Sequence, residues 1–370
     1  MTADLSARPR RLDALRRATA AAGLDAVALV PGANFQYVTG GRFGTNERPI
    51  VLILPVEGEA RLILPVLEGN SWNALDFPAR VFPWQDADGY DDAFRAAADG
   101  LSLRRLGVEG QGMRVFVQIA LAKHLPGVEL VDAQRAISAI RLRKDATEIA
   151  ALSRAIALSE TALEKTLAAV RIGMTEREIQ SLLIGHLFAG GADGLSFSPI
   201  VAAGGKSAEP HAHPGDEVIK RGDALLFDFG GTVDGFAADI TRTVFVGDAD
   251  ADSREFYETV LAANRLGHAT ARAGVTAHDV DDAVLSLLEA SRFAEFVVHK
   301  TGHGLGLDVH EDPYIMRGNR QMLEPGMVFT IEPGLYAAGR IGVRIEDDVV
   351  VTETGVDSLT SFPRDLRIVG

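Results

Sequence analysis

The sequence predicts a two-domain protein of the α/β (α+β) class, and three observations predict this class. First, 370 residues exceed what a single hydrophobic core usually encloses. Second, residues 1–135 alternate between helical and strand patterns, as in an α/β domain. Third, residues 136–370 open with a long helical pattern and contain an internal repeat. We therefore expect one domain at 1–135 and a second at 136–370.

Short apolar runs and helical patterns define the elements of the first predicted domain. Helices are expected near residues 10–23 and within 112–124. Strands are expected at Asp25–Val30, Ile50–Pro55, Ala60–Val66, Arg105–Glu109 and Val128–Asp132. None of the candidate site residues described below lies in this domain.

The second predicted domain contains a repeated segment. RIGMTEREIQSLL, which starts at Arg171, recurs as RAGVTAHDVDDAVLSLL, which starts at Arg272. In each copy a glycine ends one helix and a threonine, Thr175 or Thr276, caps the next. An acidic residue three positions later completes a capping box. Two unrelated helix ends, each followed by a helix start, would produce the same short pattern. However, a pair of acidic residues follows each copy at a similar distance. This favours two half-domains related by a pseudo-twofold axis.

Two pairs of acidic residues stand where hairpins would bring them together. Asp228 and Asp239 flank a Gly-rich turn, and Glu332 and Glu346 flank a turn centred on Gly339. The midpoint of the first pair falls between two residues, Val233 and Asp234. A turn at Asp234-Gly235 would shift the pairing by two positions. The strand period of two would still leave both acids on one face.

Acid pairs of this kind require cations. Like charges across a ladder destabilise it, and burying them unpaired costs more. Solvated acidic turns are the alternative, but the flanking segments are apolar and look buried. Four carboxylates carry a charge that two divalent ions would neutralise. Oxygen donors with one imidazole, from His303, suit manganese, and also iron, cobalt or zinc. Two such ions can activate a shared water and stabilise the oxyanion of acyl hydrolysis.

Three segments together resemble the metallopeptidases of the pita-bread fold, the family of methionine aminopeptidase, aminopeptidase P and prolidase. They are LLFDFGGTVDGFAADITRT, KTGHGLGLDVHEDP and FTIEPGLYAAGRIGVRIED. The match covers essentially the whole chain. It implies a creatinase-like N-terminal domain at 1–135 and a pita-bread catalytic domain at 136–370. It also implies that Asp228 chelates one metal, that Asp239 and Glu346 bridge both, and that His303 and Glu332 complete the second.

The resemblance also suggests which groups move protons. Glu332 is the candidate that carries a proton from the attacking water to the leaving nitrogen. His211 and His310 match positions that contact the scissile carbonyl and the developing oxyanion. For His211 the alternative is an ordinary loop histidine between prolines. His213 and His299 fit no ligand role.

Two further residues lie on the same strand faces as the proposed ligands. Thr241 is two residues from Asp239, and Arg344 is two residues from Glu346. They are expected to orient the carboxylates by hydrogen bonds. Ordinary strand residues would show the same spacing.

The two-part architecture resembles aminopeptidase P and prolidase, which cleave before proline. A strict dipeptidase benefits from a cation that binds the dipeptide carboxylate, and some prolidases carry an arginine after HE-x-P. This chain has Tyr314 there, which favours an Xaa-Pro aminopeptidase. Arg340 is a possible substitute cation and keeps an Xaa-Pro dipeptidase open. A creatinase-like hydrolase and a non-catalytic binding protein are disfavoured, because all five ligands are retained.

The composition excludes some classes of partner and indicates a cellular compartment. The net charge of −14 argues against nucleic acid or an anionic membrane as a partner. The chain has no cysteine, so it has neither disulfides nor thiolate metal sites. No apolar run approaches the roughly 20 residues of a membrane span. An N-terminal signal is not expected, because Gly23 and Asp25 interrupt the apolar run. We expect a cytoplasmic protein, and the resemblance to dimeric relatives implies a homodimer.

Overall fold

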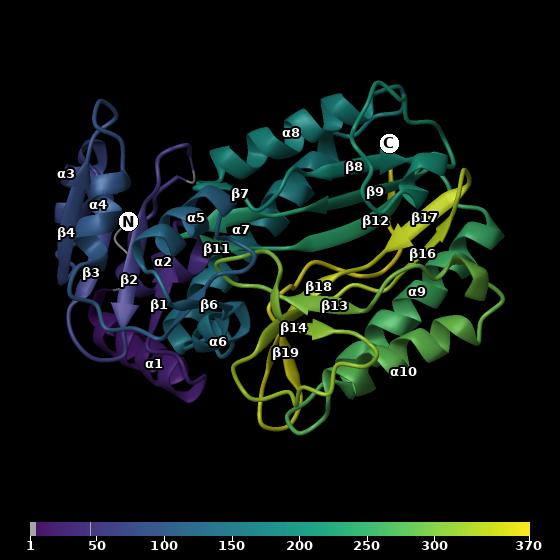
Figure 1. Ribbon diagram of the computed structural model, residues 1–370. Coiled ribbons are helices and arrows are strands. Elements are labelled where there is room, and N and C mark those ends of the chain that lie inside the picture. Colours follow the sequence, from purple (N-terminus) through teal and green to yellow (C-terminus); the bar gives the residue numbers. More distant parts are fainter. Residues whose placement is uncertain (1–4, 45) are drawn as a thin grey trace. The chain divides into compact units, whose positions relative to one another are not determined.

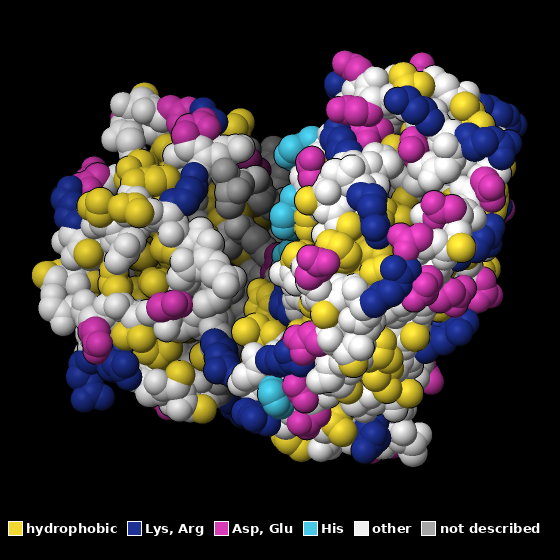
Figure 2. Space-filling model, turned by 90° about the vertical axis from the view of Figure 1, so that its right-hand side faces the viewer, with side chains coloured by type: hydrophobic (Ala, Val, Ile, Leu, Met, Phe, Trp, Pro, Cys, Tyr) yellow, Lys and Arg dark blue, Asp and Glu magenta, His cyan; other side chains and the backbone are white. Residues whose placement is uncertain are grey.

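The computed structural model describes residues 5–44 and 46–370, which form two compact units. The first unit ends at Arg141 and the second runs from Leu142 to Gly370 (Figure 1). The predicted α/β (α+β) class is confirmed. The described part of the chain contains no helix with the length and apolar character that crossing a membrane requires. On the face shown in Figure 2, acidic and basic side chains are interspersed.

The first unit is built on a six-stranded sheet with the strand order β4-β3-β2-β1-β5-β6. Its strands are β1 Ala26–Leu29, β2 Val51–Pro55, β3 Ala60–Pro65, β4 Ala79–Trp84, β5 Arg105–Val108 and β6 Glu129–Asp132. Its α-helices are α1 Arg8–Ala21, α2 Ala33–Thr39, α3 Gly69–Asn73, α4 Asp91–Ala98, α5 Val115–His124 and α6 Gln134–Ser138. Three 3-10 helices complete it: η1 Leu5–Ala7, η2 Val66–Glu68 and η3 Ala139–Arg141.

Both faces of this sheet are buried. Along β1, Ala26 and Ala28 contribute to one apolar cluster, and Val27 and Leu29 to another. The expected helices and strands are all present to within a few residues. The sequence analysis missed β4, because it is an edge strand with exposed positions and contains Pro83, which cannot donate to a ladder.

In the second unit, two helix pairs enclose several small sheets (Figure 1). Its α-helices are α7 Ala146–Ala169, α8 Glu176–Ala189, α9 Ala251–Thr270 and α10 Ala277–Glu289, with 3-10 helices η4 Gly204–Ala208 and η5 Ala294–Phe296. Strands of its first half are β7 Gly194–Leu195, β8 Ile200–Ala203, β9 Ala224–Phe229, β10 Gly231–Val233, β11 Phe236–Ala237 and β12 Ile240–Val246. Strands of its second half are β13 Gly302–Gly304, β14 Glu311–Ile315, β15 Val328–Ile331, β16 Gly334–Ala337, β17 Ile341–Arg344, β18 Asp347–Val351, β19 Val356–Ser358 and β20 Ile368–Val369.

Each half of the second unit packs its own helix pair on its own strands. The sheet β20-β12-β9-β8 shares a core with α7 and α8, in which Leu163 and Leu183 contact the cluster of Phe227. The sheet β14-β13-β15-β18-β19 contributes Phe329 to a cluster with Val280 of α10. Burial of these faces removes the site-bearing strands from water.

The internal repeat is visible as two equivalent helix starts. Thr175 caps α8 and forms a capping box with Glu178, and Thr276 caps α10 and forms one with Asp279. The backbone N–H of Glu178 donates to the Thr175 Oγ1 at 3.2 Å, and that of Asp279 donates to the Thr276 Oγ1 at 3.1 Å. Both predicted capping boxes are confirmed.

The first hairpin has the alternative register with the turn at Asp234-Gly235, and the second has the register centred on Gly339. β10 pairs with β11 so that Val233 lies opposite Phe236, which places the turn at Asp234-Gly235. Consequently Asp228 lies opposite Thr241, two positions from a direct pairing with Asp239. The second hairpin keeps the predicted centre at Gly339, because Ala337 pairs with Ile341 and Ile331 with Asp347.

Candidate metal centre

The five predicted ligands lie at the ends of strands in the two halves of the second unit. Asp228 lies in β9, and Asp239 directly precedes β12. His303 lies in β13, Glu332 follows β15, and Glu346 precedes β18. A backbone hydrogen bond from the Glu346 N–H to the Thr241 carbonyl, at 3.1 Å, joins the strands of the two halves here. Residues far apart in sequence thereby reach one place.

The structure brings all five side chains together. Asp228, Asp239 and Glu346 each place a carboxylate oxygen within 4.8 Å of the others, and so do the ligand atoms of His303, Glu332 and Glu346. The His303 Nε2 lies 3.3 Å from the Glu332 Oε1 and 3.6 Å from the Asp239 Oδ2. Glu346 belongs to both groups, which is the position of a residue shared between two ions.

The acidic residues of this cluster are buried close together, and their charges are not balanced by cations. Asp239 and Glu346 are only 4% and 2% exposed. Burial, and then the charge of Glu346, raises the pKa of Asp239 well above its usual range. Burial, and then the charge of Glu332, does the same to the pKa of Glu346, and burial raises the pKa of Glu332 to about 7. Burial also lowers the pKa of His303 to about 3, so its imidazole is neutral and can ligate.

The residues fit a pair of divalent ions. The buried Asp228 Oδ1 has no hydrogen-bond partner among the described residues, although buried carboxylate oxygens are usually paired. The donors are carboxylate oxygens and one neutral imidazole nitrogen, a set that suits hard to borderline divalent metals. A group of crowded acids with an unsatisfied oxygen is completed by cations.

Thr241 and Arg344 form hydrogen bonds with two of the candidate ligands. The Thr241 Oγ1 donates to the Glu346 Oε2 at 2.6 Å, and the Arg344 Nε donates to the Thr241 Oγ1 at 2.9 Å. Arg344 also donates to the Asp228 Oδ2 and, at 2.8 Å, to the Tyr336 Oη. Burial alone would lower the pKa of Arg344, but Tyr336 and the acidic residues raise it. The hydrogen bonds fix one oxygen of Asp228 and one of Glu346.

His310 lies beside the ligands. Its ring centroid is 4.0 Å from that of His303, and one of its nitrogens groups with Asp239 and His303. The His310 side chain is nevertheless exposed. Partial burial, and then the charge of Lys300, lowers its pKa.

His211 is exposed on the loop that follows η4, and that loop is anchored to α8. The fully buried Glu176 accepts hydrogen bonds from the backbone N–H groups of Ala203 and Gly215, at 2.8 and 2.9 Å, and from the Lys206 Nζ at 2.9 Å. A charge on His211 acts to lower the pKa of His310, so the two imidazoles are electrostatic neighbours.

The other predicted residues occupy different surroundings. Arg340, at the turn between β16 and β17, forms an ion pair with Asp252 at 3.2 Å and lies over the ring of Phe256. It is not among the clustered ligands. Tyr314, in β14, is half-buried and lies under the Lys300 Nζ. His299 is bound to the Tyr336 Oη at 2.7 Å, beside the ligands and not among them.

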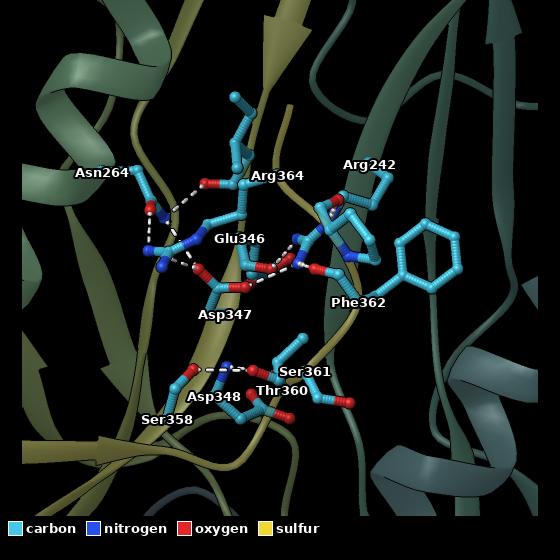
Figure 3. A network of polar contacts seen from close by, with 12 residues as sticks. Arg242, Asn264, Glu346, Asp347, Asp348, Ser358, Thr360, Ser361, Phe362 and Arg364 are labelled. Carbon is cyan, nitrogen blue, oxygen red and sulfur yellow. Dashed lines mark hydrogen bonds and ion pairs between the residues drawn. The ribbon is translucent and has the colours of Figure 1, made fainter. Parts of the chain in front are cut away.

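A polar cluster that the sequence analysis missed lies behind Glu346. Figure 3 shows Arg242, Asn264 and Arg364 converging on Asp347. The guanidinium of Arg242, which is 2% exposed, donates to the Asp347 Oδ1 at 2.7 Å and to the Glu346 carbonyl at 2.5 Å. Burial alone would raise the pKa of Asp347, but Arg242 and His268 lower it to about 2.

Asn264 of α9 extends this cluster to the other ligand segment. Its Nδ2 donates to the carbonyls of Ile331 and Ile345, at 3.1 and 3.2 Å, and to the Asp347 Oδ2 at 3.1 Å. Those carbonyls directly precede Glu332 and Glu346. The signal was present in the motifs DITRT and IED, because alternation along a strand sends Arg242 and Asp347 away from Thr241 and Glu346.

Comparisons with known proteins agree with this geometry. Residues 150–353 match the profile of Metallopeptidase family M24, and residues 11–143 match the Creatinase/Prolidase N-terminal domain. The chain is 36% identical to a probable dipeptidase PepE of Mycobacterium tuberculosis, over 97% of this chain and 96% of that protein.

Solved structures give the same family. A recombinant prolidase from Thermococcus sibiricus superposes with a TM-score of 0.93 at 34% identity, over 98% of this chain and 99% of that one. An X-Pro aminopeptidase from Thermotoga maritima gives 0.83 at 31% identity, over 95% and 100%. The chain belongs to metallopeptidase family M24 and has the pita-bread fold with a creatinase/prolidase N-terminal domain.

Proposed function

We propose that this protein is a dinuclear metallopeptidase that hydrolyses the Xaa-Pro peptide bond and releases the residue before proline. The observation that carries the proposal is the convergence of four carboxylates and one neutral imidazole in a buried site with an unsatisfied acidic oxygen. Similar proteins are named dipeptidases, prolidases and an X-Pro aminopeptidase. These names support proline-directed cleavage, and they include enzymes of both substrate lengths.

The two groups of ligand atoms suggest how two ions would be held. Asp228 would bind one ion, His303 and Glu332 the other, and Glu346, which belongs to both groups, would bind both. By the family resemblance Asp239 would also bind both, and its Oδ2 lies 3.6 Å from the His303 Nε2. Divalent ions bound there would polarise the scissile carbonyl and lower the pKa of a water molecule. Manganese is the proposed metal, because the donors are mostly carboxylate oxygens. Iron, cobalt and zinc are the alternatives that the same donors would bind.

Protein groups would move the protons and bind the developing charge. Glu332, whose Oε1 lies 3.3 Å from the His303 Nε2, would accept a proton from the attacking water and return it to the proline nitrogen. His310, beside His303, and His211 on its anchored loop would donate hydrogen bonds to the carbonyl oxygen and the oxyanion. Arg344 and Thr241 would hold Asp228 and Glu346 in place.

The proposal also covers the oligomeric state and the compartment of the enzyme. We propose a homodimer, by resemblance to dimeric relatives, and a cytoplasmic location. Light scattering of the purified protein measures the assembly, and a monomer at micromolar concentration would contradict it. Cell fractionation tests the compartment.

The function is tested with metal-stripped protein reloaded with manganese. We expect about two ions per chain by elemental analysis and cleavage of Ala-Pro and Ala-Pro-Ala but not of Ala-Ala. Exhaustive chelation should remove the activity, and manganese should restore it. Activity that is indifferent to chelation, or a metal-loaded protein that cleaves no bond before proline, would falsify the proposal.

A further inference from the structure

Lys300 is a cation beside the metal centre that has no anionic partner in the described part of the chain. It lies three residues before His303 and is half-buried. Its Nζ is 5.7 Å from the centroid of the Tyr314 ring. The buried cations nearby are all paired: Arg344 with Asp228, Lys144 with Glu311 at 2.6 Å, and Arg242 with Asp347. Lys300 therefore differs from every other cation around the site.

Backbone hydrogen bonds fix the segment of Lys300 beside the ligand cluster. The backbone N–H of Glu332 donates to the Thr301 carbonyl at 2.7 Å, and the Thr301 N–H donates to the Asp281 Oδ1 at 2.7 Å. These bonds hold the residue that follows Lys300 on both sides. The charge of Lys300 acts to lower the pKa values of Glu332, His303 and His310, so its ammonium group is within electrostatic reach of all three.

Tyr314 supplies a support for this side chain from a second strand. Gly302 lies opposite Ile315 in the β13/β14 ladder, which brings the residues just before β13 next to the end of β14. The Asn319 Nδ2 donates to the Tyr314 carbonyl at 2.6 Å and fixes that end. A lysine ammonium group is attracted to the face of an aromatic ring. That contact positions the ammonium without neutralising it.

An anion is the ligand that this arrangement lacks. An Xaa-Pro dipeptide carries a carboxylate one residue beyond the bond that is cut. A hydrogen bond from the Lys300 ammonium group to that carboxylate would join two charged groups, and such bonds are stronger than bonds between neutral groups. A longer peptide, or an amide, has no carboxylate at that position.

We propose that Lys300, supported by the ring of Tyr314, binds the C-terminal carboxylate of Xaa-Pro dipeptides and makes this enzyme prefer dipeptides. The inference rests on the proposed function and deepens it. It also changes the expectation drawn from Tyr314 in the sequence. The cation comes from the segment before β13, and the tyrosine supports it.

The test combines a change in the protein with a change in the substrate. Lys300→Met should lower kcat/KM for Ala-Pro about 10- to 100-fold, mainly through KM, since a charge-assisted contact is lost. The same variant should change kcat/KM for Ala-prolinamide, which lacks the carboxylate, by less than about threefold. Lys300→Arg should restore most of the dipeptide activity, because arginine also binds carboxylates. Lys165→Met, at an exposed lysine of α7, is the matched control and should behave as wild type on both substrates.

The outcomes separate the alternatives. Equal losses on the dipeptide and the amide would mean that Lys300 acts on the scissile group, which overturns the proposal. No loss on the dipeptide would overturn it as well. Calorimetric binding of proline and of prolinamide, which have no Xaa-Pro bond to cleave, to the manganese-loaded protein gives a readout that does not need turnover. If wild type binds proline more tightly and Lys300→Met abolishes that difference, the carboxylate site stands even where Xaa-Pro hydrolysis fails.

Discussion

Glu346 and Asp347 are consecutive acidic residues, both buried, in opposite electrostatic surroundings. Glu346 faces Asp228, Asp239 and Glu332, and burial with these charges raises its pKa. Asp347 faces Arg242, which together with His268 lowers its pKa to about 2 against the effect of burial. One face of the strand thus gathers acids and the other pairs an acid with cations.

The difference shows that burial alone does not distinguish a structural acid from a ligand. Asp347 has its counter-charges and hydrogen bonds within the protein, from Arg242 and Asn264. Within the described residues the Glu346 carboxylate accepts one hydrogen bond, from Thr241, and burial raises its pKa, which disfavours the charged form. The face on which the acids outnumber the cations, with Arg344 beside four carboxylates, is the one that requires metal.

The largest expected effect follows from removing a shared ligand. Asp239→Ala and Glu346→Ala should abolish turnover, because each removes a carboxylate that groups with ligand atoms of both halves of the second unit. Metal content by elemental analysis should fall with the activity. Retention of about two ions per chain in either variant would contradict the assignment of the ligand face.

A substitution of His310 tests catalysis separately from metal binding. His310→Ala should retain metal, since the five ligands remain, and should lose about 10²–10⁴ in kcat through the missing hydrogen bond at the reacting group. Steady-state kinetics beside metal analysis checks both halves of this expectation. His278→Ala, at a histidine of α10 that contacts the Gly318 backbone, is a control that should keep wild-type kcat.

On the side of the strand where Asp347 pairs with Arg242, a substitution is expected to change the free energy of unfolding. Asp347→Ala would leave Arg242 buried without its carboxylate, which costs about 3–5 kcal/mol. Metal-free Glu346→Gln should be at least as stable as the metal-free wild type, because it removes a repelling charge. Urea unfolding in the presence of a chelator measures both. Equal destabilisation by the two substitutions would erase the contrast between the faces.

The smallest effect is a dependence on pH. In the metal-free protein the pKa of Glu332 is raised from 4.5 to about 7, so the folded state retains a proton that the unfolded state has lost. Stability from this group is full below pH 4.5 and declines as the pH rises to about 7. The melting temperature with chelator should therefore fall over this range, whereas manganese should increasingly offset the fall. A flat difference between the two curves would contradict the electrostatic account.

The sequence predicted the ligand strands because two-residue periodicity and turn chemistry act locally. The Asp234-Gly235 turn and the centre at Gly339 determine both registers, and these place the acids. Asn264 could not be predicted in the same way. Its contacts with Ile331 and Ile345 join a helix to strand ends 67 and 81 residues away.

The contact between Lys300 and Tyr314 was also beyond local reasoning. The β13/β14 ladder changes register between Gly302 and Gly304, so counting residues along the two strands does not give the neighbours of Lys300. The function of Tyr314 was judged from its own identity, whereas the structure relates it to a side chain on another segment. Irregular pairing is where tertiary structure adds information to a motif.

The repeat-derived capping boxes of Thr175 and Thr276 give each half of the second unit its own helix start and its own apolar core. Yet Asp228 and Asp239 come from one half, and His303, Glu332 and Glu346 from the other. Ions that bind only when both halves contribute hold the two halves together. By mass action, metal binding then adds to the free energy of unfolding of the second unit. The duplicated architecture thus couples catalytic competence to cohesion, so that separating the halves would cost the enzyme its metals at the same moment.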